Sequence, residues 1–203
     1  YNSVIAAHQF SSFYYFGTDG TICENTDFGS FEVTSEDPLT VKYTINEGVK
    51  WSDGTPVTAA DLVLQWAAFS GYYDDADAEA KTGTSYFSYA GDPTGIALTD
   101  FPELGEDGRS MTLKYSQPFA DWEIAIGGPG VDIPAHVLAK KAGLADAKAF
   151  VDLVKGMPRG DAKAPQPANT QLQAMAEMWN TGFDSKTLPA DPDPGGHHEQ
   201  YQH

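Results

Sequence analysis

Four acidic residues with nearly alternate spacing, Asp74, Asp75, Asp77 and Glu79, form the closest approach to a metal-binding pattern in this sequence. Carboxylates at alternate positions begin the loops that bind calcium, because this hard cation takes several oxygen ligands. Such loops also need a glycine at their sharp turn and a closing glutamate. Ala80 stands at the turn position, and no glutamate follows at the closing position. The sequence therefore predicts a solvated acidic loop, with no metal site and no cofactor.

The motifs that usually carry catalysis are missing from the sequence. It contains no Gly-x-Ser-x-Gly turn, no phosphate-binding loop and no HExxH zinc motif. Paired carboxylates could perform hydrolysis, but so acidic a chain brings acidic residues together by chance. We therefore expect a protein that is not an enzyme, and a hydrolase is the least favoured alternative.

The other possible metal ligands are scattered along the chain. His8 and His136 are isolated in the sequence, which favours structural roles for both. His197 and His198 adjoin carboxylates, but nothing around them would orient their rings, so any metal binding there would be adventitious. Cys23 is the only cysteine, which excludes an internal disulfide, and its expected role is that of a small buried apolar residue.

Composition limits the partners of the chain. The formal net charge of −17 argues against nucleic acid or an anionic membrane surface, because phosphate binding requires clustered Lys and Arg. Hydrophobic residues make up 41% of the 203 residues, enough for the core of one domain with or without an appendage. The sequence has no apolar run of about 18 residues and no signal-peptide pattern at its N-terminus.

The stretch GVKWSDGTPVTAADLVLQW combines two tryptophans, a turn and the start of a helix. Trp51 is large enough to seal one end of a small core, and Asp53 can bond its own backbone within the Ser-Asp-Gly turn. Thr58 is suited to the N-cap position, and Asp61 can complete a capping box with it. Because each residue has a structural role, we interpret the stretch as architecture rather than as a catalytic site.

The apolar pattern predicts an α/β (α+β) fold, a small mainly antiparallel sheet with packed helices. Alternating residues predict a hairpin of strands over 31–35 and 39–45, and a later strand over 111–115. The capped segment predicts a helix over 58–69 whose apolar side faces the sheet. Residues 71–110 are rich in loops and should lie on a surface or at a cleft.

The C-terminal half is predicted to be mainly helical. A short apolar segment at 122–126 and a region at 134–142 are expected to form helices, and 159–168 to form a loop. Two apolar stripes have helical spacing: Phe150, Val151, Val154 and Met157, then Leu172, Met175, Ala176 and Trp179.

The segment INEGVKWSDGTPVTAADLVLQW resembles the signature region of family 5 solute-binding proteins, the extracellular oligopeptide- and dipeptide-binding subunits of ABC importers. Every position from Gly48 to Ala59 matches, and Asp61 and Trp66 also match. Asn46 departs from the family, which usually carries Arg there. FEVTSEDPLTVKYTI and MTLKYSQPFADW are similar to the family's strand-turn-strand and to a later strand with Pro and aromatic residues.

The resemblance implies part of the first lobe of a periplasmic-binding-protein-like type II fold. Residues 1–130 would form the sheet-plus-helix part of this lobe, 131–187 a helical segment of the same lobe, and 188–203 a flexible tail. Family members are longer, with two lobes and often a lipid anchor, so we expect a fragment without the second lobe. Such a fragment should bind solute weakly or not at all alone, because half of the contact surface is absent.

The resemblance also implies a function and its partners. The function is extracellular binding of a solute, with a peptide favoured, for an ABC-type import system. The partners are that solute and the permease subunits, and contact with a membrane would occur only through a lipid anchor absent from this chain. The full-length protein would be lipid-anchored at the cell surface or periplasmic.

Aromatic residues supply the predicted ligand contacts. In the resembling proteins an aromatic loop after this helix lines the cleft, which makes Tyr86, Phe87 and Tyr89 the leading candidates. Aromatic rings give broad apolar contact, which suits promiscuous peptide binding. The alternative for these three residues is packing onto the sheet. Phe13 and Tyr14 are weaker candidates, which could equally be strand residues near the hinge.

Two structural requirements follow from these predictions. Membership of this family requires Trp51 and Trp66 to be buried and a sheet to lie beneath Leu62. A protein-interaction or adhesion domain that reuses the lobe is the alternative function. That alternative would be marked by an exposed apolar patch on the helices of 134–183.

Overall fold

The computed structural model describes residues 12–125, 131 and 133–182 of the chain. Within these residues a four-stranded antiparallel sheet has the order β3-β4-β6-β5, and a two-stranded hairpin of β1 and β2 lies outside it. The strands are β1 (Tyr14–Phe16), β2 (Ile22–Glu24), β3 (Gly29–Glu36), β4 (Leu39–Ile45), β5 (Glu103–Leu104) and β6 (Ser110–Lys114). The predicted hairpin and the predicted third strand are confirmed within a few residues, and β1 agrees with the alternative given for Tyr14. The strands β2 and β5 were not predicted.

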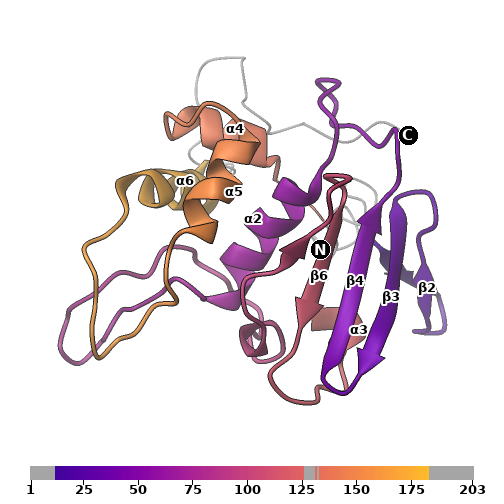
Figure 1. Cartoon of the computed structure of the whole chain (residues 1–203), viewed down its shortest axis with the longest axis horizontal. Coiled ribbons are helices and arrows are strands. Elements are labelled where there is room, and N and C mark those ends of the chain that lie inside the picture. The colour runs from indigo at the N-terminus through magenta and orange to yellow at the C-terminus, as the bar shows by residue number, and fades with distance from the viewer. Residues whose placement is uncertain (1–11, 126–130, 132, 183–203) are drawn as a thin grey trace.

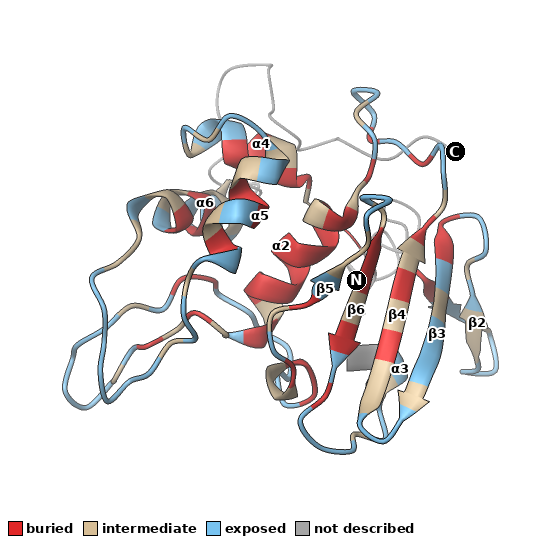
Figure 2. Cartoon of the chain, viewed as in Figure 1, coloured by how far each residue is buried: buried red, intermediate tan, exposed pale blue. Residues whose placement is uncertain are grey.

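A central helix lies between the sheet and the three helices nearest the C-terminus. The helical elements are α2 (Ala59–Ser70), the 3-10 helix η1 (Ile96–Leu98), α3 (Trp122–Ala125), α4 (Ala135–Lys141), α5 (Ala147–Lys155) and α6 (Thr170–Thr181). Figure 1 shows α2 between the sheet on one side and α4, α5 and α6 on the other. Because it packs on both sides, α2 is buried along most of its length (Figure 2). The predicted fold class is confirmed.

The start of α2 follows the predicted chemistry. The Thr58 hydroxyl accepts a hydrogen bond from Ala60 N, and Asp61 Oδ2 accepts one from Thr58 N at 2.8 Å, which completes the capping box. Trp51 and Trp66 are 0% exposed and Leu62 is 1% exposed. These three residues therefore have the burial that membership of the predicted family requires.

The core on the sheet side comes from alternate residues of two neighbouring strands. Val41 is paired with Leu113, and Tyr43 with Met111, and these four side chains are buried. Since strand residues two apart lie on the same face, one face of β4 and β6 is apolar. Cys23 was expected to be buried, but it is only half-buried, because it lies in the short β1–β2 hairpin outside the main sheet.

The apolar stripes of the C-terminal helices turn inward. Phe150, Val151 and Val154 of α5 are buried, as are Leu172, Met175 and Ala176 of α6. Within the described residues, the large exposed apolar side chains lie elsewhere, at Tyr15, Phe16, Val33 and Tyr89. The apolar patch expected of an adhesion domain is thus not found on the described part of these helices.

Asn46, the residue that departs from the family pattern, has a structural role. Its Nδ2 donates to Thr26 O at 2.7 Å and to Asp27 O at 3.1 Å. The side chain therefore ties the end of β4 to the turn that precedes β3.

Candidate functional site

A pocket of about 490 Å³ opens at the C-terminal end of α2. Its walls include Phe69, Phe87 and Tyr89, and Asp74 and Ser85 contribute polar atoms. We refer to it as the aromatic pocket. Two of the three leading candidates for ligand contact, Phe87 and Tyr89, line it.

Ring contacts fix the aromatic walls. Phe69 and Tyr89 stack with their centroids 4.2 Å apart and an interplanar angle of 17°. Trp179 of α6 makes edge-to-face contacts with Phe87 at 5.9 Å and with Phe69 at 6.2 Å. Such pairs favour defined ring orientations, so these three contacts support the walls of the pocket.

The predicted ligand residues differ in accessibility. Tyr89 is 38% exposed, whereas Tyr86 and Phe87 are each 7% exposed. Phe13 is buried against Phe28 and Tyr43, with centroid distances of 5.0 and 5.2 Å. Of these candidates, Tyr89 has the largest exposed fraction, whereas Phe13 is a core residue that directly precedes β1.

Tyr14 is not among the described residues that line the aromatic pocket, but Tyr89 is one of its electrostatic neighbours. Burial, and then the neighbouring phenol of Tyr89, raise the pKa of Tyr14 to about 12. The Tyr14 ring also meets Phe16 edge to face at 5.6 Å. The weaker candidate Tyr14 is thus a buried residue of β1, 7% exposed, outside the described lining of the pocket.

The loop that carries these aromatics is held from α6. Asn180 Nδ2 donates to Tyr86 O at 2.9 Å, and Asn180 Oδ1 accepts from Ser88 N at 2.7 Å. The Tyr86 hydroxyl accepts a bond from Asn169 N at the start of the same helix. Sequence reasoning missed Asn180, because no local pattern links it to a loop more than 90 positions earlier.

Asp74 and Asp75 do not belong to a solvated loop, so that interpretation is wrong for these two residues. Asp74 Oδ1 accepts from Tyr86 N at 2.8 Å and Oδ2 from the Ser85 hydroxyl at 3.2 Å, while burial raises its pKa. Asp75 is 6% exposed and accepts from Gln166 N at 2.6 Å and Thr84 N at 2.7 Å. The hydrogen bond from Gln166 N is the largest cause of the lowered pKa of Asp75, and the bond from Thr84 N also lowers this pKa.

The carboxylates are occupied in holding loops. Asp77 Oδ1 accepts from the backbone N–H groups of Glu79 and Ala80 and shapes a turn. In the part of the chain that the structure describes, no group of three or more His, Cys, Asp or Glu side chains is arranged to hold a metal ion.

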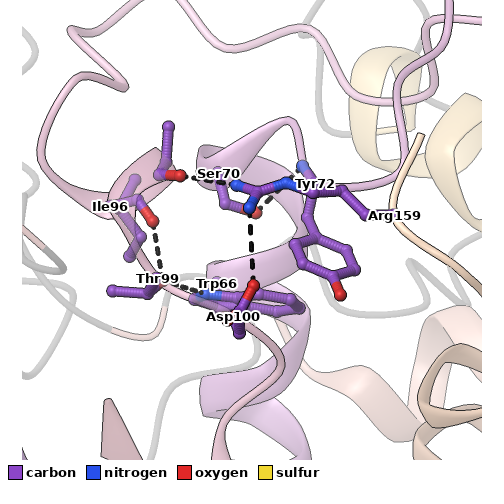
Figure 3. A network of polar contacts seen from close by, with 8 residues as sticks. Trp66, Ser70, Tyr72, Ile96, Thr99, Asp100 and Arg159 are labelled. Carbon is purple, nitrogen blue, oxygen red and sulfur yellow. Dashed lines mark hydrogen bonds and ion pairs between the residues drawn. The ribbon is translucent and has the colours of Figure 1, made fainter. Parts of the chain in front are cut away.

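A polar network braces the end of α2 where the pocket opens (Figure 3). Trp66 Nε1 donates to the Thr99 hydroxyl at 2.8 Å, and that hydroxyl donates to Ile96 O at 2.6 Å. The Arg159 guanidinium lies 5.0 Å from the centroid of the Tyr72 ring and donates to Ala97 O at 2.6 Å. The network connects α2, η1 and the segment after α5.

His136 is not isolated in the structure. Its Nε2 lies 2.9 Å from Asp53 Oδ2, so the start of α4 is joined to the Ser-Asp-Gly turn. This pairing supports the predicted structural role of His136. His8, His197 and His198 lie outside the described residues.

This chain belongs to the bacterial extracellular solute-binding proteins of family 5, whose middle-region model matches residues 29–153. The match begins at the first residue of β3 and includes α2 and the aromatic pocket. It confirms the family that the signature stretch predicted.

Individual relatives agree with this assignment. The chain is 42% identical over 194 residues to an uncharacterized lipoprotein of Mycobacterium tuberculosis, covering 96% of this chain and 29% of that protein. It is 33% identical over 124 residues to the oligopeptide-binding protein OppA of the same species, covering 61% of this chain and 19% of OppA. The chain thus spans less than a third of the length of these relatives.

A solved structure shares part of the fold. A periplasmic EDTA-binding protein, EppA, aligns with a TM-score of 0.50 and 29% sequence identity. The alignment covers 71% of this chain and 25% of that protein, consistent with part of one lobe of a periplasmic binding protein. None of the described helices has the length and apolar character needed to cross a bilayer.

Proposed function

We propose that this chain forms part of an extracellular solute-binding protein that supplies an ABC importer, and that its solute is a peptide. The observation that carries the proposal is the family match over residues 29–153, which includes the sheet, α2 and the aromatic pocket. The similarity to OppA, an oligopeptide-binding protein by name, favours peptides over other solutes.

The aromatic pocket is the proposed contact with the solute, chiefly through Tyr89, with Phe87 and Phe69 behind it. Aromatic walls accept varied side chains, because much of their contact energy comes from apolar area. The stacked rings and the Asn180 bonds hold the walls in place before a solute arrives. Less conformational entropy is then lost on binding.

The partners and location follow from the same proposal. Permease subunits of the importer would receive the solute. The similarity to a lipoprotein supports a lipid-anchored position at the cell surface, and the EDTA-binding relative supports a periplasmic position. In either place the protein binds rather than converts its solute.

Calorimetry tests this function. The complete gene product that contains this chain is titrated with pooled peptides of two to six residues and, as a control, with the corresponding free amino acids. Saturable heat with at least one peptide pool, and none with the amino acids, is the expected result. Saturation by no peptide pool would overturn the peptide assignment.

A further inference from the structure

The aromatic pocket combines its aromatic walls with negative charge. Asp74 lines the pocket, and its carboxylate is bonded to Tyr86 N and to the Ser85 hydroxyl. Among the described residues that line the pocket there is no Lys, Arg or His. Burial raises the pKa of Asp74, the bonds from Tyr86 N and Ser85 lower it, and the adjacent Asp75 raises it again. Of the lining residues that the structure describes, Asp74 is the one with a charged side chain.

The end of α2 adds to this negative potential. Ser70 and Gly71, where the helix ends, both line the pocket, and the last turn of the helix itself contains no basic residue. The nearby Arg159 lies over the Tyr72 ring, donates to Ala97 O and Asp100, and does not line the pocket. The C-terminus of an α-helix carries a partial negative charge, which a nearby cation stabilises. Gly71 also lies close to Asp74, since a Cβ at this glycine would be 3.6 Å from Asp74 Oδ2.

The aromatic walls favour the same kind of ligand. Ring faces attract ammonium and guanidinium groups within about 6 Å of their centroids. Tyr89 is 38% exposed at this pocket and has the acidic Asp92 as an electrostatic neighbour. A carboxylate, a helix C-terminus and aromatic rings therefore surround one cavity.

We infer that the aromatic pocket binds a cationic group of the solute, an ammonium or guanidinium on an aliphatic stem. The stem packs against Phe69 and Tyr89, and the charged end lies toward Asp74 and the end of α2. The inference rests on the proposed function in one respect, which is that the solute bearing the cationic group is a peptide. The cationic group is then a basic side chain of that peptide or its amino terminus.

The pocket is tested first with small probes that do not depend on peptide binding. Aromatic NMR signals of the 203-residue chain are followed during titration with n-butylammonium, 1-butanol and butyrate. We expect saturable shifts at Phe69 and Tyr89 with n-butylammonium, at an affinity about tenfold above that of 1-butanol, and none with butyrate. Equal responses to n-butylammonium and 1-butanol, or no response to n-butylammonium, would overturn the inference.

Variants assign the effect to the carboxylate. Asp74→Asn keeps an oxygen for the bond from Tyr86 N but removes the charge, and should bring the affinity for n-butylammonium down to that for 1-butanol. Glu32→Gln makes the same change in net charge on exposed β3 and should change nothing. If Asp74→Asn fails to fold, Tyr89→Leu retains apolar area without the ring, and should also reduce the preference for the cation.

Peptides then separate this inference from the proposed function. Two tetrapeptides are titrated into the complete gene product. They differ at one position, which is lysine in one peptide and norleucine in the other. The expected result is that the lysine peptide binds about tenfold more tightly and that Asp74→Asn removes this preference. Such a result supports both the cation site and the proposed function. Equal binding of the two peptides contradicts the cation site, whereas binding of n-butylammonium without binding of any peptide contradicts only the proposed function.

Discussion

Asp61 Oδ1 accepts a hydrogen bond of 2.8 Å from the backbone N–H of Ala135, which lies 74 positions later in the chain. The other oxygen of the same carboxylate accepts the bond from Thr58 N that completes the capping box. Asp61 is 3% exposed, and this burial raises its pKa. One side chain thus caps α2 and also fixes the first residue of α4 against it.

Replacing Asp61 should destabilise the fold more than replacing the N-cap residue. Asp61→Ala leaves two backbone N–H groups without their acceptor, and we expect a loss of about 3 kcal/mol in the free energy of unfolding. Thr58→Ala removes one capping bond and should cost about 1 kcal/mol. Urea unfolding followed by circular dichroism measures both values. Equal losses would show that the bond to Ala135 contributes nothing.

Asp75 gives the stability of the loops a predictable dependence on pH. Its pKa in the folded state lies below the model-compound value of 3.8, so the folded state binds fewer protons than the unfolded state. The stabilisation by Asp75 is therefore present above pH 3.8 and is lost as the pH falls through the folded-state pKa. The melting temperatures of the wild type and Asp75→Asn should differ at pH 6 and converge toward pH 3. A difference that does not vary with pH would contradict this assignment.

The Thr99 hydroxyl is the expected weak point of the network at the end of α2. Thr99→Val preserves the shape of the side chain but leaves the buried Trp66 N–H without an acceptor, at a cost of about 2 kcal/mol. Thr40→Val removes an exposed bond to Pro38 O and serves as the matched control, with little expected change. Thermal unfolding of the two variants gives the comparison. Similar melting temperatures for both would exclude a stabilising role for the Trp66–Thr99 bond.

Gly91 leaves room for the ring of Tyr89. A Cβ at Gly91 would lie 2.2 Å from the Tyr89 hydroxyl oxygen, so Gly91→Ala must displace this ring. We expect the stack on Phe69 to be disturbed and solute binding to weaken about tenfold, with little loss of stability because an exposed side chain can move. Gly156→Ala meets only ordinary contacts of 3.5 and 3.6 Å and is the control for calorimetric titration. Equal affinities for the two variants would argue against a solute contact at Tyr89.

Local patterns predicted the elements that depend on local chemistry. The capping box at Thr58 and Asp61 and the alternation in β4 depend on residues a few positions apart, and the structure has both. The bond from Ala135 to Asp61, the bonds of Asn180 and the burial of Asp75 depend on tertiary contacts over 74 to 94 positions. No periodicity in the sequence encodes such contacts.

The candidate site was predictable in the same limited sense. Aromatic residues after α2 indicated a contact surface, and Phe87 and Tyr89 line the pocket. Their partners Phe69 and Trp179 had been assigned only to the apolar faces of helices. Asp74 and Asp75 of the acidic run were misinterpreted because composition does not reveal which backbone N–H groups of other segments bond to these carboxylates.

The central claim, that the aromatic pocket contacts the solute, is tested most directly by mapping a bound peptide. Phe and Tyr rings are isotopically labelled in the complete gene product, and a peptide that saturates in calorimetry is added. If the pocket contacts the solute, the largest changes in aromatic chemical shift should occur at Phe69, Phe87 and Tyr89, while the exposed Tyr15 of β1 is unaffected. Saturable binding that leaves the signals of these three rings unchanged would contradict this claim.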